Sequence, residues 1–307
     1  MIFRVFSYLS LCLFITVSLT AEDLITGTTR LLVDGARSPF YFPVYTLDGN
    51  SILITRSGYA GLWSLDRSSG EIAQITAASG SGYRPVSLTT GAVIFRQDTY
   101  SKGRKLTSLH RYDGNGAQVL AKENRFVSPA NLVDDNLVYL SATEPVTLNG
   151  MTGQMAAPMN SPVVFNDGLT LSIYQSGQMS PLSPQGDGHY IWAALAPTHD
   201  MIAYTKAGAG SFVCDLKGNI IAELGYAHAP QWSPDGKYLV YMHDLDNGVQ
   251  FTDSELWIVS YNGEQSWQIT RTPDRIELYP QWAPEGDRVI YHTVEGNIME
   301  TTLEILD

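Results

Sequence analysis

Cysteine is almost absent from this chain, which has two in 307 residues, Cys12 and Cys214. Cys12 lies in an apolar N-terminal run, so the rest of the chain holds a single cysteine and can form no internal disulfide. Cys214 lies in an apolar segment, where we expect a buried structural thiol rather than a reactive one. The fold must therefore be stabilised by packing and by closure of the fold on itself.

Basic residues are also scarce, with 19 Lys and Arg against 31 Asp and Glu and a net charge of −12. Such an acidic chain is a poor electrostatic match for nucleic acid or for an anionic membrane surface. Long apolar runs are missing after the first 20 residues. We therefore expect no transmembrane segment in the mature chain.

Local catalytic motifs are missing as well. The chain has no Gly-x-Ser-x-Gly, no His-Glu-x-x-His, no phosphate-binding glycine loop and no Cys-x-x-Cys. No catalytic residue can be assigned on this basis. A site assembled from distant segments would leave no local signature, so catalysis itself is not excluded.

The first 21 residues have the pattern of a secretory signal peptide. Arg4 is followed by an apolar run and then by Thr20-Ala21, a small-residue cleavage site. The alternative is an uncleaved anchor, for which the run is short, since a spanning helix needs about 20 apolar residues. We predict a signal peptide over 1–21, a single mature domain over 22–307, and a periplasmic or secreted location.

A repeated segment indicates the fold. Residues 230–241 and 280–291 both read Pro-Gln-Trp-x-Pro-Asp/Glu-Gly followed by an apolar strand ending in Tyr. The Pro-Asp/Glu-Gly part is a turn between two strands. Weaker copies begin near residues 43, 85, 128 and 195, and each unit continues into a second hairpin. Six units of four strands predict an all-β, six-bladed β-propeller with four-stranded antiparallel blades.

Two units are irregular. The sixth ends after its third strand, whereas residues 28–35 resemble a fourth strand that lacks its own blade. We predict that this N-terminal strand completes the last blade and closes the ring, which leaves no long exposed edge. The third unit carries an insertion over 140–168, whose strand layout the pattern does not define.

The Trp-Ser-Pro-Asp-Gly hairpin at 232–236, the Leu-Trp-Ile strand at 256–258 and the closing Gln-Ile-Thr at 268–270 resemble the repeat of the TolB-like propeller family. This resemblance implies a six-bladed propeller and a periplasmic protein-binding role in cell-envelope assemblies. TolB carries an α/β domain before its propeller, whereas here only a few residues separate the signal peptide from the first strand. The motif residues define a fold and not a function.

Blade geometry places a candidate site on one face of the ring. The loops between second and third strands and the connections between blades should share this side, which we call the loop face. Cationic and aromatic residues recur there: Arg56, Tyr83, Arg84, Arg96, Trp192, Lys206, His228, His243, Tyr279 and His292. This set suits an anionic or carbohydrate-like ligand or an acidic peptide. The alternative is that the rings pack between blades and the cations are solvated.

Two metal sites are conceivable, although neither matches a recognised motif. His228, His243 and His292 could ligate zinc if they converged. Asp244 and Asp246 could contribute to a calcium site, but Asp side chains in such a turn more often bond their own backbone. We expect no metal or other cofactor.

These features favour an exported, monomeric binding or scaffolding module of the cell envelope, with a protein or glycan partner at the loop face and no nucleic acid. One alternative is a carbohydrate-active lyase or hydrolase whose site is assembled across blades on that face. Another is a purely structural envelope component.

Overall fold

The structure is a computed structural model that describes residues 23–306. The predicted signal peptide and its cleavage site lie outside the described residues. One short 3-10 turn, Ser57–Tyr59, accompanies the strands, and nothing helical in residues 23–306 is long and apolar enough to cross a membrane.

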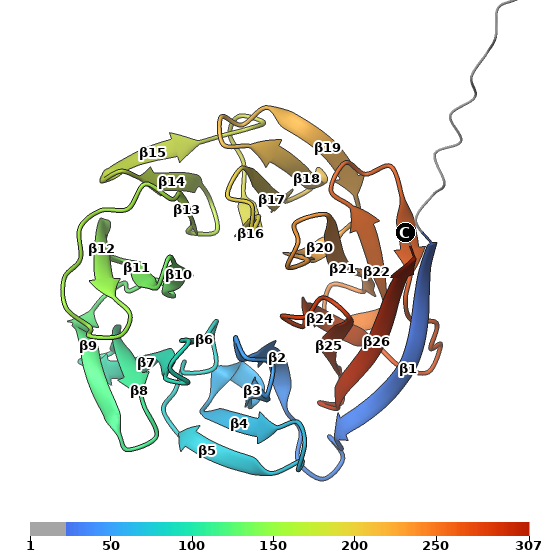
Figure 1. The fold of residues 1–307 in the computed structure, drawn as a ribbon, viewed down its shortest axis with the longest axis horizontal. Coiled ribbons are helices and arrows are strands. Elements are labelled where there is room, and N and C mark those ends of the chain that lie inside the picture. Colours follow the sequence, from blue (N-terminus) through green and yellow to red (C-terminus); the bar gives the residue numbers. More distant parts are fainter. Residues whose placement is uncertain (1–22, 307) are drawn as a thin grey trace, which may run out of the picture.

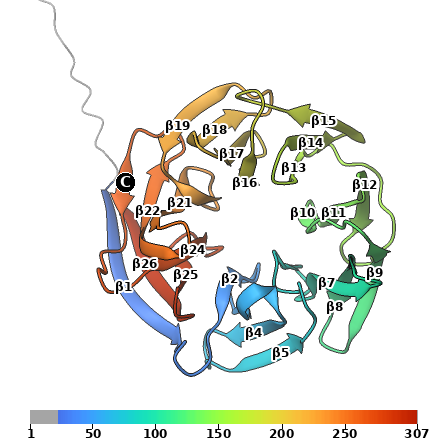
Figure 2. The same ribbon diagram turned by 180° about the vertical axis from the view of Figure 1, so that it is seen from behind.

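The strands form a ring of seven blades around a central axis (Figures 1 and 2). Blade 1 consists of β2 (Tyr41–Tyr45), β3 (Ser51–Thr55), β4 (Leu62–Asp66) and β5 (Ile72–Thr76). Blade 2 consists of β6 (Val86–Ser87), β7 (Val93–Ser101), β8 (Arg104–Tyr112) and β9 (Ala117–Asn124). Blade 3 consists of β10 (Asn131–Val133), β11 (Asn136–Ser141) and β12 (Glu144–Asn149). Blade 4 consists of β13 (Val163–Asn166), β14 (Leu171–Gln175) and β15 (Gln178–Leu182).

The remaining three blades have four strands each. Blade 5 consists of β16 (Tyr190–Leu195), β17 (Met201–Lys206), β18 (Gly210–Asp215) and β19 (Ile220–Gly225). Blade 6 consists of β20 (His228–Trp232), β21 (Tyr238–Asp246), β22 (Phe251–Ser260) and β23 (Ser266–Gln268). Blade 7 consists of β24 (Glu277–Trp282), β25 (Arg288–Thr293), β26 (Ile298–Leu306) and β1 (Asp23–Val33).

The prediction of six four-stranded blades is therefore wrong. The third predicted unit, with its insertion over 140–168, is in fact two blades of three strands each. In blade 3 a single isolated bridge between Leu148 and Met155 stands where a fourth strand would pair. In blade 4 only residues 183–189 separate β15 from β16, which is too short a segment to cross the blade again and return to the axis.

The two strongest repeats show how neighbouring blades are joined. Trp232 and Trp282 are each 8% exposed and end the inner strands of blades 6 and 7. Each indole N–H donates to a backbone carbonyl of the preceding blade, Trp232 to Ala194 at 3.0 Å and Trp282 to Gln231 at 3.2 Å. The repeated tryptophan thus fills the space between blades and satisfies its own polar atom there.

The prediction for Cys214 is confirmed. Its side chain lies in the apolar core of blade 5, packed with Phe212 and Tyr204. Burial raises the pKa of the thiol to about 12, so the thiolate is not formed near neutral pH.

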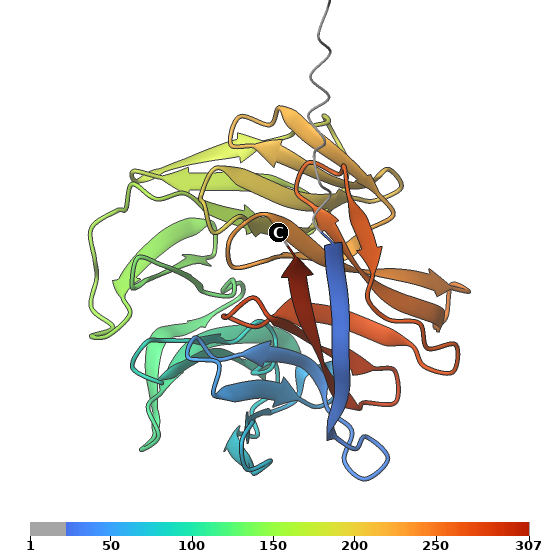
Figure 3. The same ribbon diagram turned by 45° about the vertical axis from the view of Figure 1, so that its right-hand side comes forward.

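Ring closure by the N-terminal strand is also confirmed. β1 pairs antiparallel with β26, and the two strands lie side by side along the outside of blade 7 (Figure 3). The amide of Thr28 donates to the hydroxyl of Thr302 at 2.9 Å, and the hydroxyls of Thr29 and Thr301 are also 2.9 Å apart.

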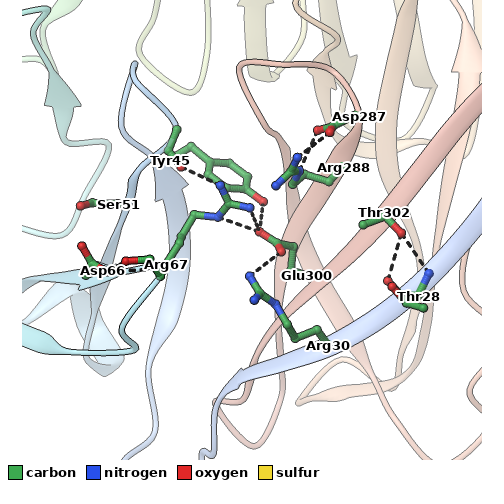
Figure 4. A network of polar contacts seen from close by, with 12 residues as sticks. Thr28, Arg30, Tyr45, Ser51, Asp66, Arg67, Asp287, Arg288, Glu300 and Thr302 are labelled. Carbon is green, nitrogen blue, oxygen red and sulfur yellow. Dashed lines mark hydrogen bonds and ion pairs between the residues drawn. The ribbon is translucent and has the colours of Figure 1, made fainter.

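A buried carboxylate reinforces this closure (Figure 4). Glu300 of β26 is 4% exposed and forms ion pairs at 2.9 Å with Arg30 of β1 and with Arg67, which follows β4. The phenol of Tyr45 in blade 1 donates to the same carboxylate at 2.8 Å. One side chain therefore links the closing strand, the last blade and the first blade.

Candidate functional site

A cavity of about 700 Å³ occupies the centre of the ring, and the inner strands of all seven blades contribute to its lining. Tyr59 and Tyr83, from the loop face, line one part of it, whereas Leu47 and His199 come from turns on the opposite face. The cavity therefore follows the axis of the propeller from the loop face inward, and we call it the channel.

The inner strands carry an unusual backbone feature at the channel. In the inner strands, or just before them, five non-glycine residues have φ between 48° and 52°: Phe42, Arg84, Trp192, Ala229 and Tyr279. All five line the channel, and in blades 1, 5, 6 and 7 the strand pairing is interrupted at the same place. A left-handed conformation costs a non-glycine residue about 1–3 kcal/mol, and such residues gather at functional sites.

Aromatic rings form a continuous wall on one side of the channel. Phe42 lies 4.5 Å from Tyr59 and 4.8 Å from Tyr279, measured between ring centroids, and Tyr59 lies 4.9 Å from Tyr83. Burial raises the pKa of Tyr59 to about 12 and also raises that of Tyr279. The wall therefore presents neutral rings, with apolar faces and phenol groups able to donate hydrogen bonds.

His292, a predicted site residue, supports this wall from behind. It is 2% exposed, stacks on Tyr279 at 5.6 Å, and accepts a hydrogen bond on Nδ1 from the amide of Phe42 at 3.2 Å. Burial lowers the pKa of His292 to about 3, so the imidazole is neutral. It holds the bulge of blade 1 in place and does not line the channel.

Arg84 supplies the positive charge of the channel. Its side chain is exposed. Among the described residues that line the channel, no other is a Lys, Arg, Asp or Glu. Arg96 lies behind it, 4.6 Å from the ring of Tyr83, and donates to the carbonyl of Val127 at 3.0 Å. Burial lowers the pKa of Arg96, yet a guanidinium remains charged, so Arg96 adds positive potential and orients Tyr83.

Two other predicted cations are used elsewhere. The guanidinium of Arg56 lies 3.8 Å above the ring of Phe40 and donates to the carbonyl of Pro39 at 2.6 Å. Lys206 donates to the carbonyl of Gln185 at 2.6 Å. Both side chains hold nearby loops through backbone carbonyls, and neither lines the channel.

The other two histidines belong to a cluster beside Trp192. His228 lies 5.1 Å from that ring, and its Nδ1 is 2.9 Å from the carboxylate of Asp244, which is 2% exposed. His243 is exposed and lies near Tyr226. Trp192 therefore lines the channel, His228 packs against it outside the lining, and His243 lies on the surface.

The zinc site that His228, His243 and His292 could have formed by converging is not present among the described residues. Asp246 accepts a hydrogen bond from the amide of Gly248 at 2.7 Å, as expected for a turn. Within residues 23–306, no three His, Cys, Asp or Glu side chains are grouped so as to hold a metal ion.

Several channel residues were missed by the sequence analysis. Phe42 and Tyr59 complete the aromatic wall, and four amide side chains also line the channel: Asn131, Asn166, Gln231 and Gln281. A signal existed for some of them. In four blades the left-handed residue comes directly before a proline. Gln231 and Gln281 each come directly after such a proline.

A buried carboxylate near this face gives a pH-dependent prediction. Glu277, at the start of β24, is fully buried, and one of its oxygens has no hydrogen-bond partner among the described residues. Burial, with a smaller contribution from the charge of Glu255, raises the pKa of Glu277 from 4.5 to about 7. The contribution of protonated Glu277 to the free energy of unfolding is thus fully present below pH 4.5. It is lost as the pH rises through 7.

Glu277→Gln should therefore stabilise the protein above pH 7, by up to about 3 kcal/mol, and should leave it nearly unchanged at pH 4.5. Denaturant unfolding at both pH values measures this difference. Glu264→Gln, on an exposed turn, is the control and should have no such pH dependence. An equal effect of Glu277→Gln at the two pH values would show that folding does not raise the pKa of this carboxyl.

Comparisons with known proteins support the fold. No family model and no curated protein sequence matches the chain. Among solved structures, oligogalacturonate lyase from Vibrio parahaemolyticus is 14% identical with a TM-score of 0.59, over 92% of this chain and 97% of that one. A putative TolB from Agrobacterium tumefaciens is 14% identical with a TM-score of 0.52, over 87% and 90%.

TolB from Acinetobacter baumannii is 15% identical over 88% of this chain and 56% of its own length, with a TM-score of 0.47. At such identities the likeness concerns the fold and not the activity. The resemblance of the repeats to TolB-like propellers is thus supported by the three-dimensional structure. By its fold, the chain is a β-propeller of the type found in TolB and in oligogalacturonate lyase.

Proposed function

We propose that this protein is a binding module that receives an extended segment of a partner protein in its channel. The observation that carries this proposal is the left-handed residue repeated in five blades, within the inner strand or just before it, each lining the channel. A strained backbone repeated at one cavity favours a role in binding over a role in stability. The cavity volume, about 700 Å³, is also within the range of ligand sites.

The composition of the lining favours a peptide over a charged sugar polymer. Most lining residues are Val, Ala, Leu, Pro or aromatic, which suit apolar side chains. The four amide side chains can donate to and accept from peptide groups. Arg84 is suited to one carboxylate of the partner, and an acidic side chain near an aromatic residue would meet both Arg84 and the wall. A polymer with a carboxylate on every unit would need more cations than this lining provides.

We further propose that the module acts outside the cytoplasm, in the cell envelope. The pattern of the first 21 residues supports this location, and the likeness to TolB propellers agrees with it. N-terminal sequencing of the protein from its native host is the direct check, and an intact Met1 in a cytosolic fraction would contradict it.

The binding proposal can be tested with a random peptide library displayed on phage. The protein should enrich peptides that combine aromatic or aliphatic residues with Asp or Glu. Trp192→Ala should lower the affinity for the selected peptides by at least about ten-fold, because a large ring is removed from the channel wall. Arg84→Gln should abolish the preference for acidic residues.

Lys237→Gln is the matched control, since it removes one exposed positive charge on the β20–β21 turn, outside the channel lining. It should leave peptide binding unchanged. Absence of enrichment, or equal effects of Arg84→Gln and Lys237→Gln, would contradict the proposal. Cleavage of oligogalacturonate by the wild type, lost in Arg84→Gln, would instead favour the lyase alternative.

A further inference from the structure

A second cavity, of about 810 Å³, lies at the joint between blade 7 and blade 1, away from the channel. It is open to solvent and surrounds the Glu300 network of Figure 4. Every lining residue is polar or charged: Thr28, Arg30, Asn50, Asp66, Arg67, Ser68, Arg288, Glu300 and Thr302. Such a lining does not suit an apolar partner, and its size is that of a small-molecule site.

The acidic groups of this cavity already have partners. Both oxygens of Glu300 accept from arginine or tyrosine. Asp66 accepts from the amides and hydroxyls of Ser68 and Ser69, and these hydrogen bonds lower its pKa to about 2. Glu300 is therefore not free to hold a cation. All four hydrogen bonds to Asp66 end on Oδ1, so its Oδ2 stays free, but one carboxylate alone supplies too few ligands for a cation site.

The arginines differ in how fully they are used. Arg67 uses all three of its nitrogens, because it contacts Glu300 through Nε and Nη2 and donates to the carbonyl of Gly49 through Nη1. Arg30 is half exposed and uses one nitrogen, Nη2, on Glu300. Arg288 uses Nε and Nη2 on Asp287. Among the described residues, the remaining guanidinium N–H groups of Arg30 and Arg288 have no acceptor.

We propose that this cavity binds a small ligand bearing an oxyanion group, a carboxylate, phosphate or sulfate, held by Arg30 and Arg288. A guanidinium is suited to oxyanions because its planar N–H groups can donate in pairs. Thr302 and Ser68 also line the cavity, and their hydroxyl oxygens can accept hydrogen bonds from hydroxyl groups carried by the ligand.

The position of the two arginines links binding to ring closure. Arg30 is on β1 and Arg288 is on β25, and these strands flank β26 in the sheet of blade 7. A ligand that bridges them holds β1 against the blade. Since it binds only the closed ring, it stabilises that state by mass action.

The experiment uses the full mature protein and three probes, which are sodium phosphate, sodium sulfate and galacturonate, with ionic strength held constant by NaCl. The melting temperature of the wild type should rise with probe concentration beyond the NaCl baseline. Arg30→Gln and Arg288→Gln should each weaken the apparent affinity at least ten-fold. Arg37→Gln is the control, because Arg37 is exposed and lies outside the cavity, and it should respond as the wild type does.

Sulfate and phosphate also stabilise proteins without specific binding, and that effect is the same in all variants. Specific binding is therefore measured by the difference between the wild type and the variants in how far the probe raises the melting temperature. A response to all three probes assigns the site to the oxyanion alone, and a response to galacturonate only assigns it to a sugar acid. Probe-dependent protection of β1 amides from hydrogen exchange would confirm the link to closure. Responses that persist equally in Arg30→Gln and Arg288→Gln, or no response to any probe, would overturn the proposal. Arg84→Gln should not alter this binding, which separates it from the channel.

Discussion

Glu300→Ala should lower the free energy of unfolding by about 3–5 kcal/mol, the usual cost of removing one partner of a buried ion pair. Arg67 would lose the carboxylate that compensates its charge while remaining mostly buried, at 15% exposure. The phenol of Tyr45 would lose its acceptor in a buried place. The closing strand would lose its ion pair through Arg30, so β1 should separate from β26 before the rest of the ring unfolds.

Denaturant unfolding measures the total loss, and hydrogen exchange of β1 amides measures the local one. Glu304→Ala is the control, because Glu304 lies on the same strand but is exposed. It should change stability by less than about 0.5 kcal/mol. Equal losses in the two variants would show that Glu300 contributes no more than a surface charge.

Trp282→Ala should also cost about 3–5 kcal/mol, through the cavity that it leaves in the core. The ring packs among Tyr238, Val240 and Leu278, across the boundary between blades 6 and 7. Its removal would also leave the carbonyl of Gln231 without the indole donor. The midpoint of denaturant unfolding should fall accordingly.

Trp267→Ala offers a comparison of the same chemistry in a different place. Trp267 is on β23, the outer strand of blade 6, and is only partly buried. Because less apolar surface is returned to water, Trp267→Ala should lower the free energy of unfolding clearly less than Trp282→Ala does. A Trp282→Ala variant as stable as Trp267→Ala would show that the repeated tryptophan is not a joint between blades.

The fold was predictable where the turns are built from Pro-Asp-Gly. Blades 6 and 7 carry this pattern, and closure followed from the missing strand of the last unit. Blades 3 and 4 turn differently. Asp134 and Asp135 reach positive φ, 47° and 61°, in a two-residue hairpin turn without proline or glycine. Aspartate tolerates this conformation, and this hairpin was still found as the copy that begins near residue 128. The first hairpin of blade 4 turns through residues 167–170, which lack the Pro-Asp-Gly pattern, and its first strand lies in the supposed insertion, so two blades were counted as one.

The candidate site was predictable in part, because strand ends indicate which face a residue occupies. This reasoning found Tyr83, Arg84 and Tyr279. It could not show that Arg56 is held by Phe40 and Pro39, since that depends on a loop of no regular pattern. It also missed Phe42, although Phe42 precedes a proline and has a left-handed φ, as Arg84 and Tyr279 do.

The pairing of β1 with β26 has a consequence for how the chain folds. Residues joined in this ladder are separated by about 270 positions, as for Thr28 and Thr302. Six blades consist of contiguous segments and can form as the chain emerges from the ribosome, whereas the seventh must wait for strands from both of its ends. Contacts of such long separation form slowly. Until then β1 and β26 are unpaired edges, so this is the interval in which a nascent molecule would exchange its closing strand with a neighbour.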